Sequence, residues 1–161
     1  SNNTVVLLLS LLYLSKMVIL QLCDLSDNLK NDYVLPIIMN LHNPYRLITL
    51  DHTVLTSLGD SAGLASPLVQ RVMTLYRQEA EKMVHGIDNA LHREDWQAAF
   101  RLAHTLKSSS ASVGAYALSE IAKQIESLIR QQQSQQACAL VQILQTEYQQ
   151  VMSELVAMIH S

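Results

Sequence analysis

Apolar side chains recur every three or four residues along four long stretches of this 161-residue chain, from Ser66-Pro67 almost to its end. This spacing puts the apolar residues of each stretch on one face of an α-helix. The whole chain contains only four glycines and three prolines, the residues that most often interrupt helices. Amphipathic helices joined by short links bury their apolar faces against one another, so the pattern predicts an all-α fold, an antiparallel four-helix bundle.

Local residue types indicate where these helices begin and end. Ser66-Pro67 is an N-cap residue followed by proline at the first helical position, which is typical of a helix start. Asp95 is expected near the start of the next helix, where acidic residues favour the helix dipole. That helix is expected to end near Gly114, because glycine adopts the backbone turn that other residues avoid. Residues 131–136 are mostly glutamine and predict a short polar link before the last helix.

Each long helix has one face that is expected to be buried. For the first two helices these residues are Val72, Leu75, Tyr76, Ala80, Met83, Ile87, Ala90, Leu91, Trp96, Ala99, Phe100, Ala103, Leu106, Ser110 and Val113. For the last two they are Leu118, Ile121, Ala122, Ile125, Leu128, Ile129, Ala137, Val141, Leu144, Tyr148, Val151, Leu155 and Met158. Together they predict the core of the bundle.

The first 45 residues have a different character from the rest. Residues 5–22 are almost continuously apolar and approach the length of a membrane span. Lys16 lies near the middle of this run, and a charge there costs about 2.5–3.5 kcal/mol on insertion. The features of a signal peptide are also missing. We therefore expect a hydrophobic N-terminal segment over 1–45 and a bundle domain over 46–161, with membrane anchoring, packing from an upstream domain and dimerisation left open for the segment.

Charge, cysteine and histidine content argue against several kinds of site. The net charge is −3 and lysine and arginine do not cluster, so a nucleic-acid surface is not expected. Cys23 and Cys138 lie far apart without the spacing of metal ligands, and we expect buried thiols in a reducing compartment. His85, His92 and His104 contain no pair four residues apart, so no metal site is predicted.

One helix face carries a histidine among unusually small side chains. Residues 103–115 read AHTLKSSSASVGA, with Arg101 one turn before His104 and with Lys107 and Ser108 one turn after it. Cationic groups on both sides suit a phosphoryl group on the imidazole, because charge-assisted hydrogen bonds are the stronger ones. Small neighbours also leave room for a large partner to approach.

This face resembles the histidine-phosphotransfer (HPt) domain of multistep phosphorelays, whose core reads His-x-Leu-Lys-Gly-Ser-Ser/Ala-x-x-x-Gly. The matching residues are His104, Leu106, Lys107, Ser109, Ser110 and Gly114. The departure is Ser108, where the family usually has glycine. The resemblance covers roughly residues 50–160, an entire domain of this family, and it too implies a four-helix bundle.

The resemblance implies that His104 accepts a phosphoryl group from the aspartate of one receiver domain and passes it to another. The domain is then a cytoplasmic phosphocarrier and not an enzyme by itself, although it is often the C-terminal part of a hybrid sensor histidine kinase. No cofactor is expected on this chain, because the receiver supplies the acidic pocket and Mg²⁺. Residues 36–40 are similar to the fourth strand of a receiver, so 1–45 can be a remnant of a degenerate one.

The family pattern also assigns supporting roles. Lys107 is expected to contact phosphoryl oxygens, and the residues expected to contact the phosphoryl group or the partner are Arg101, Ser108, Ala111 and Glu126. Glu126 holds a position where family members often have Gln or Glu, and it either orients the imidazole or pairs with Arg130 four residues on. Gly114 is expected to be structural. An alternative is a helical docking module that binds a receiver without transferring phosphate.

Overall fold

The computed structural model describes residues 48–59 and 61–160. Its elements are α3 (His52–Leu58), a 3-10 turn η1 (Gly63–Ala65), α4 (Pro67–His92), α5 (Trp96–Ser112), α6 (Tyr116–Arg130), α7 (Ser134–Ala139) and α8 (Val141–His160). These residues belong to one unit, Ile37–Ser161. The predictions for residues 1–45, including Cys23 and the domain boundary, lie outside the described residues.

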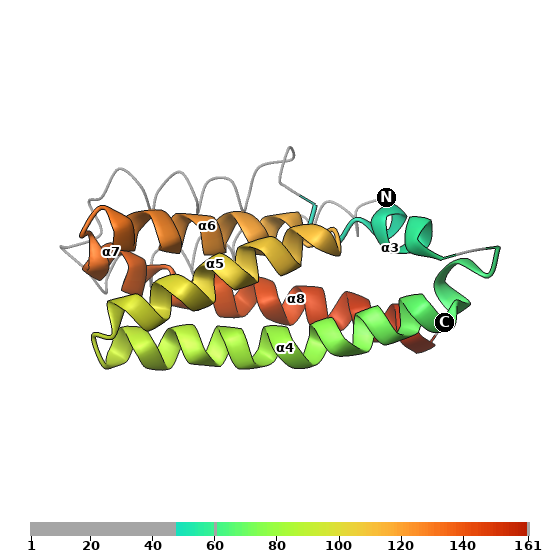
Figure 1. Ribbon diagram of the computed structural model, residues 1–161, viewed down its shortest axis with the longest axis horizontal. Helices are drawn as coiled ribbons and strands as arrows, with labels where there is room; N and C mark the ends of the chain where they lie inside the picture. Colours follow the sequence, from blue (N-terminus) through green and yellow to red (C-terminus); the bar gives the residue numbers. More distant parts are fainter. Residues whose placement is uncertain (1–47, 60, 161) are drawn as a thin grey trace, which may run out of the picture. The chain divides into compact units, whose positions relative to one another are not determined.

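The four long helices form a closed bundle. α4 packs against α5, α5 against α6, α6 against α8, and α8 against α4. Short connections reverse the chain after α4 and after α5, so neighbouring helices run in opposite directions (Figure 1). The predicted all-α antiparallel bundle is confirmed, and α3 lies at the end of the bundle where α4 begins and α8 ends (Figure 1).

The helix starts follow from their capping residues. The Asp51 carboxylate accepts a hydrogen bond from the Thr53 amide at 3.0 Å and caps α3. The Asp95 carboxylate accepts one from the Ala98 amide at 3.0 Å and caps α5. Both groups satisfy amides that a helix leaves without a partner. α4 begins with Pro67, as expected, although the Ser66 hydroxyl makes no capping bond.

Three helices end in the same left-handed turn. Its central residues are Glu94 after α4, Gly114 after α5 and Gln132 after α6, with φ of 57°, 84° and 60°. Each turn is closed by a 2.8 Å backbone bond, Asp95 to Ala90, Ala115 to Ser110 and Gln133 to Leu128. This is the pattern of a Schellman motif, in which the central position favours glycine. Only one of the three positions is occupied by glycine.

Gly114 also allows a close approach between two parts of the chain. The Asp51 amide donates a 2.9 Å hydrogen bond to the Gly114 carbonyl. A Cβ atom on Gly114 would lie 2.8 Å from the Asp51 carbonyl oxygen. The start of α3 therefore rests directly on the turn that follows α5.

The core largely matches the predicted faces, with a few differences. The prediction that Leu75 is buried is wrong, because its side chain is 50% exposed. The buried face of α4 runs instead through Val69, Met73, Tyr76 and Ala80. The other predicted residues that are only half-buried are Val72, Trp96, Phe100, Ile129 and Tyr148. The contact face of each helix is thus shifted slightly from the average position of its large apolar side chains.

The prediction for the last helix needs two corrections. The expected polar link at 131–136 includes the start of α7, and Leu140 separates α7 from α8. Leu140 is fully buried, which indicates that the break is held by an apolar side chain. Cys138 is exposed and not buried as expected, since α7 turns Ala137 inward instead.

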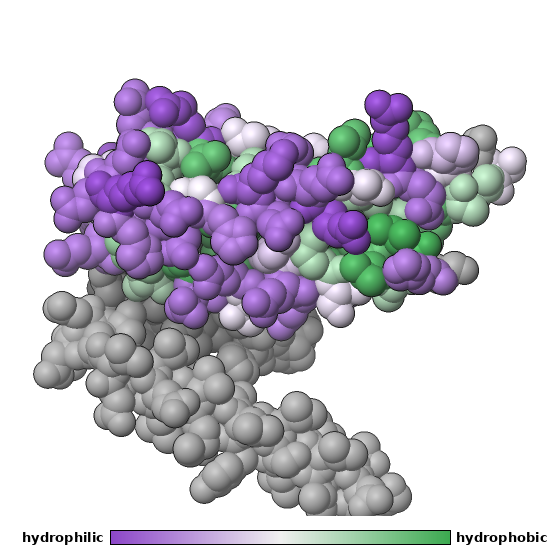
Figure 2. Space-filling view, turned by 90° about the horizontal axis from the view of Figure 1, so that it is seen from below, coloured by the Kyte–Doolittle hydropathy of each residue, from purple (hydrophilic) through white to green (hydrophobic). Residues whose placement is uncertain are grey.

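Apolar surface is concentrated at one end of the bundle. Leu68 and Leu75 of α4 are 57% and 50% exposed. On the face of the molecule that Figure 2 shows, the apolar residues lie mainly toward the end where α4 begins, and the rest of that face is largely polar. Among the described residues, no helix combines the length and the hydrophobicity that a membrane span requires.

Candidate functional site

His104 lies near the middle of α5 with 58% of its side chain exposed. The exposed side chains that follow it on α5 are all small: Thr105, Ser108, Ala111 and Ser112. The ring is therefore accessible to a large partner. The ring also forms a hydrogen bond with the neighbouring helix, α6.

Glu126 of α6 is the centre of this contact. Its side chain is 3% exposed, and its two oxygens accept hydrogen bonds from three cationic or basic groups. Oε1 lies 3.0 Å from His104 Nδ1 and 2.9 Å from Arg130 Nη2, and Oε2 lies 2.6 Å from Lys107 Nζ. The contacts expected under both sequence-based alternatives for Glu126 are present, because one carboxylate contacts the histidine and Arg130 together.

The carboxyl group of Glu126 is ionised at neutral pH, because its pKa is lowered from the ordinary value. Burial by itself raises the pKa of a carboxyl group, but hydrogen bonds and charge from Lys107 and His104 outweigh it and hold the pKa of Glu126 below its ordinary value of 4.5. A hydrogen bond to the charged form favours that form. The buried group is therefore a fixed negative charge beneath the imidazole.

This charge determines which ring nitrogen carries the proton. A carboxylate only accepts hydrogen bonds, so His104 Nδ1 must be the donor. Lys107 Nζ also lies 3.4 Å from Nδ1, but an ammonium cannot donate to a nitrogen that already carries hydrogen, and its 2.6 Å bond goes to Glu126. In the neutral ring Nε2 then has the free lone pair, and no described residue forms a hydrogen bond with it.

Lys107 is held in place through its backbone as well as its ammonium. The Ser119 hydroxyl of α6 donates a 2.8 Å hydrogen bond to the Lys107 carbonyl. The side chain is 28% exposed, so its ammonium lies at the edge of the site and not in bulk solvent. Two contacts with α6 therefore fix the turn of α5 that follows His104.

Comparison with known proteins agrees with this geometry. Residues 71–154 match the family model described as the Hpt domain, a range that includes most of α4 and α8 and all of α5 and α6. The chain belongs to the Hpt family. No curated protein sequence matches the chain.

One solved structure supports the same assignment. The crystal structure of histidine-containing phosphotransfer protein B (HptB) from Pseudomonas aeruginosa PAO1 is similar, with a TM-score of 0.64 and 25% sequence identity. The match covers 70% of this chain and 95% of the HptB chain. Hpt domains carry phosphoryl groups on a histidine in phosphorelays and are phosphocarriers, not catalysts.

Within this Hpt domain, three of the residues expected at the site form no hydrogen bond or ion pair with the imidazole side chain. Arg101, Ser108 and Ala111 are exposed on α5. The Ser108 hydroxyl donates to the His104 carbonyl at 3.2 Å and so folds back on its own helix. Arg101 forms no ion pair with any described residue, and the second cation beside Glu126 is Arg130.

Two residues beside His104 were not predicted as part of the Hpt site. Phe100 was expected in the core, and Arg130 was named only as a possible partner of Glu126. Phe100, expected in the core, is half-buried and stacks with His104, with ring centroids 6.4 Å apart and planes 16° apart. The Arg130 guanidinium carbon lies 5.6 Å from the centroid of the Phe100 ring. The signal was spacing, since Phe100 precedes His104 and Arg130 follows Glu126 by one helical turn.

Proposed function

We propose that this Hpt domain accepts a phosphoryl group on His104 from the aspartyl phosphate of a receiver domain and passes it to the receiver of a response regulator. The observation that carries the proposal is an exposed imidazole whose Nδ1 is held by the buried Glu126 carboxylate. Its other nitrogen is left available to a partner. The neighbouring surface of α5 is exposed and consists of small side chains, which suits docking of a second protein.

The chemistry assigned to His104 is a transfer between two acceptors. The lone pair of Nε2 forms the N–P bond while the P–O bond to the receiver aspartate breaks, and those electrons return to its carboxylate. The ring keeps its Nδ1 proton and becomes cationic. Glu126 stabilises this charge more strongly than the neutral ring, so its interaction grows as the reaction proceeds.

Charge neutralisation at the phosphoryl group is divided between the two proteins. Lys107 supplies an ammonium 3.4 Å from His104 Nδ1, and its flexible stem lets it move from Glu126 toward a phosphoryl oxygen. Mg²⁺ and the acidic pocket come from the receiver in this proposal. The Hpt domain then needs only to present the imidazole at a fixed position, which is a positioning role.

The test is phosphoryl uptake from a phosphorylated receiver, followed by intact-mass detection over a panel of receivers. The wild-type chain should gain one acid-labile, base-stable phosphoryl group, and His104→Gln should gain none. His85→Gln is the matched control, because His85 is an exposed histidine of α4 outside the site. It should be phosphorylated like the wild type.

Two outcomes would count against the proposal. Uptake by His104→Gln at the wild-type rate would show that another residue is the acceptor. Binding of several receivers with no transfer to or from the wild-type chain would instead identify a docking module. Stopped transfer with retained binding in His104→Gln would support the proposal and separate the two functions.

A further inference from the structure

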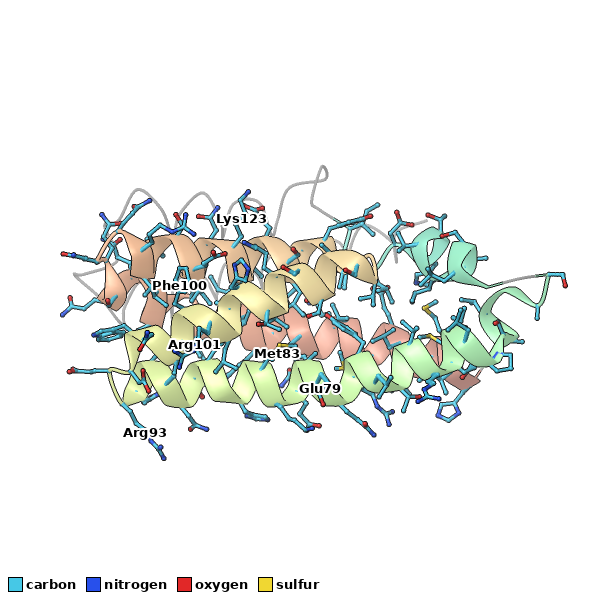
Figure 3. The ribbon with its side chains drawn as sticks, viewed as in Figure 1. Glu79, Met83, Arg93, Phe100, Arg101 and Lys123 are labelled. Atoms are coloured by element: carbon cyan, nitrogen blue, oxygen red, sulfur yellow. The ribbon has the colours of Figure 1, made fainter. Side chains whose placement is uncertain are left out.

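The contacts around His104 form a closed cycle of four side chains. Phe100 stacks on His104, His104 donates to Glu126, Glu126 accepts from Arg130, and Arg130 lies over Phe100. α5 and α6 each contribute two residues one turn apart. Figure 3 shows Phe100 projecting from α5, the helix that also carries the imidazole.

A hydrogen bond alone leaves the imidazole partly free. The χ2 torsion of histidine is broad and has no sharp preferred value. The bond from Nδ1 to Glu126 fixes one atom of the ring, but the ring plane can still turn about that direction. A stacked neighbour limits this freedom, and the planes of Phe100 and His104 lie 16° apart.

Arg130 links the two restraints. Its guanidinium lies 5.6 Å from the Phe100 centroid and 2.9 Å from Glu126 Oε1. Cations are attracted to the face of an aromatic ring, so Arg130 holds Phe100 and the carboxylate in one arrangement. The side chain of Arg130 is 66% exposed, yet its two contacts point inward to the cycle.

We propose that Phe100 and Arg130 are positioning residues that, together with Glu126, fix the plane and tautomer of the His104 imidazole. This inference rests on the proposed function of His104 and adds two residues to it. In the free amino acid the proton prefers Nε2, the position that must be empty for phosphoryl transfer. The four-residue cycle reverses this preference by keeping Nδ1 directed at the carboxylate.

The direct test is the tautomer ratio of His104, measured by ¹⁵N NMR on histidine-labelled protein at a pH where the ring is neutral. The wild type should be mainly protonated at Nδ1. Phe100→Leu keeps apolar volume but removes the ring, and Arg130→Met keeps length but removes the charge. Both should shift His104 toward the Nε2-protonated form and slow phosphoryl transfer by up to about a hundredfold, the loss that a misplacement of about 1 Å can cause.

Conservative and matched variants separate positioning from folding. Phe100→Tyr retains the aromatic face and should restore the wild-type tautomer ratio and transfer rate. Arg101→Met removes an exposed arginine of the same helix that is outside the cycle, and its tautomer ratio should be that of the wild type. Folded Phe100→Leu or Arg130→Met protein with the wild-type ratio would overturn the inference, whatever its transfer rate.

The two proposals can fail separately. The tautomer measurement does not require phosphorylation, so it tests the four-residue cycle even if the wild-type chain takes up no phosphate. Absence of uptake by the wild type would reject the proposed function only. An unchanged tautomer ratio with slower transfer would reject the positioning role and assign Phe100 or Arg130 to partner docking.

Discussion

Lys107 and Glu126 are joined across two helices by a 2.6 Å hydrogen bond between an ammonium and a buried carboxylate. The same pair lies directly beneath the exposed imidazole of His104. The cation that neutralises this carboxylate is thus the same one that the proposed function assigns to the phosphoryl group. Under the proposed function, the stability of the domain and phosphoryl transfer both depend on this one pair.

Glu126→Gln should destabilise the domain mainly at neutral pH. The substitution removes the charge that holds Lys107 and Arg130, and hydrogen bonds to charged groups contribute about 1.5–3 kcal/mol each. The pKa of Glu126 is lowered in the folded state. At a pH between that folded pKa and the ordinary value of 4.5, the unfolded chain therefore binds more protons than the folded chain. The wild-type contribution is therefore present above this pH and is lost as the pH falls through the folded pKa.

Urea unfolding from neutral to acidic pH measures this difference. The free energies of unfolding of wild type and Glu126→Gln should converge as the pH falls. Glu79→Gln is the control. Glu79 of α4 (Figure 3) forms an exposed pair with Lys82 at 2.8 Å, and such pairs contribute about 0–1 kcal/mol. A constant gap between wild type and Glu126→Gln over the whole range would contradict the assigned charge state.

Gly114→Ala should lower the stability of the bundle by about 1–3 kcal/mol, the cost of holding a residue with a side chain in a left-handed conformation. The φ of Gly114 is 84°, and a Cβ atom would also approach the Asp51 carbonyl oxygen to 2.8 Å. Chemical denaturation gives the loss directly. An Ala variant as stable as the wild type would show that the turn and α3 can move at little cost.

Glu94→Gly should have the opposite effect. Glu94 occupies the equivalent turn after α4 with φ of 57°, and glycine removes the cost of a side chain there. We expect a gain of about 0.5–1 kcal/mol, offset in part by the greater freedom of glycine in the unfolded chain. Thermal unfolding measures it, and a loss of stability would mean that the Glu94 side chain contributes interactions of its own.

The fold was readable from the sequence because its signals are local. Helix starts at Asp95 and Pro67 and the turn at Gly114 follow from residue types that favour one backbone conformation. Errors occurred where tertiary packing decides. The sequence did not indicate that Leu75 would be exposed or that α7 would begin within the polar link, since a neighbouring helix selects the contact face and a buried Leu140 holds the break.

The candidate site was only partly readable for the same reason. His104 and Lys107 are close in sequence, so a helical pattern places them together. The contact between His104 and Glu126 joins two helices, and the family resemblance suggested it where the pattern could not. Phe100 looked like a core residue because spacing places it beside the buried face, and only the packing of α5 on α6 shows that its ring meets the imidazole.

Tyr76 and Ser110 should behave as a coupled buried pair. The Tyr76 hydroxyl and the Ser110 hydroxyl lie 2.8 Å apart between α4 and α5, and Ser110 is fully buried. Tyr76→Phe or Ser110→Ala leaves one buried hydroxyl without its partner, which costs about 1–3 kcal/mol. The double variant should lose less than the sum of the single losses. Strict additivity in urea unfolding would show that the hydroxyls do not interact.

The same pair predicts a loss of stability at high pH. Burial raises the pKa of Tyr76 to about 12, against the opposing effect of its bond to Ser110, and nearby Tyr148 raises it slightly. The unfolded tyrosine releases its proton near its ordinary value of 10.0, so the contribution is complete below that pH and is lost as the pH rises toward 12. Tyr76→Phe should remove this part of the alkaline decline.

Ser108 should limit how closely a partner reaches the imidazole. It is exposed one turn after His104, and its hydroxyl bonds to the backbone of its own helix. Ser108→Leu should leave the free energy of unfolding within about 0.5 kcal/mol of the wild type, as is usual for surface substitutions. Phosphoryl transfer should fall by about tenfold or more, because a bulky side chain beside the reacting nitrogen obstructs the partner and tilts the reacting groups out of line.

Ser108→Gly tests the opposite change and restores the residue that the family usually has at this position. Transfer should be as fast as in the wild type or faster, while the helix loses about 0.5 kcal/mol from the lower helix propensity of glycine. Gln149→Leu is the control for added apolar volume, since Gln149 is exposed on a different helix, α8. A Ser108→Leu domain that exchanges phosphoryl groups at the wild-type rate would place the docking surface on the other side of His104, toward α6 and Arg130.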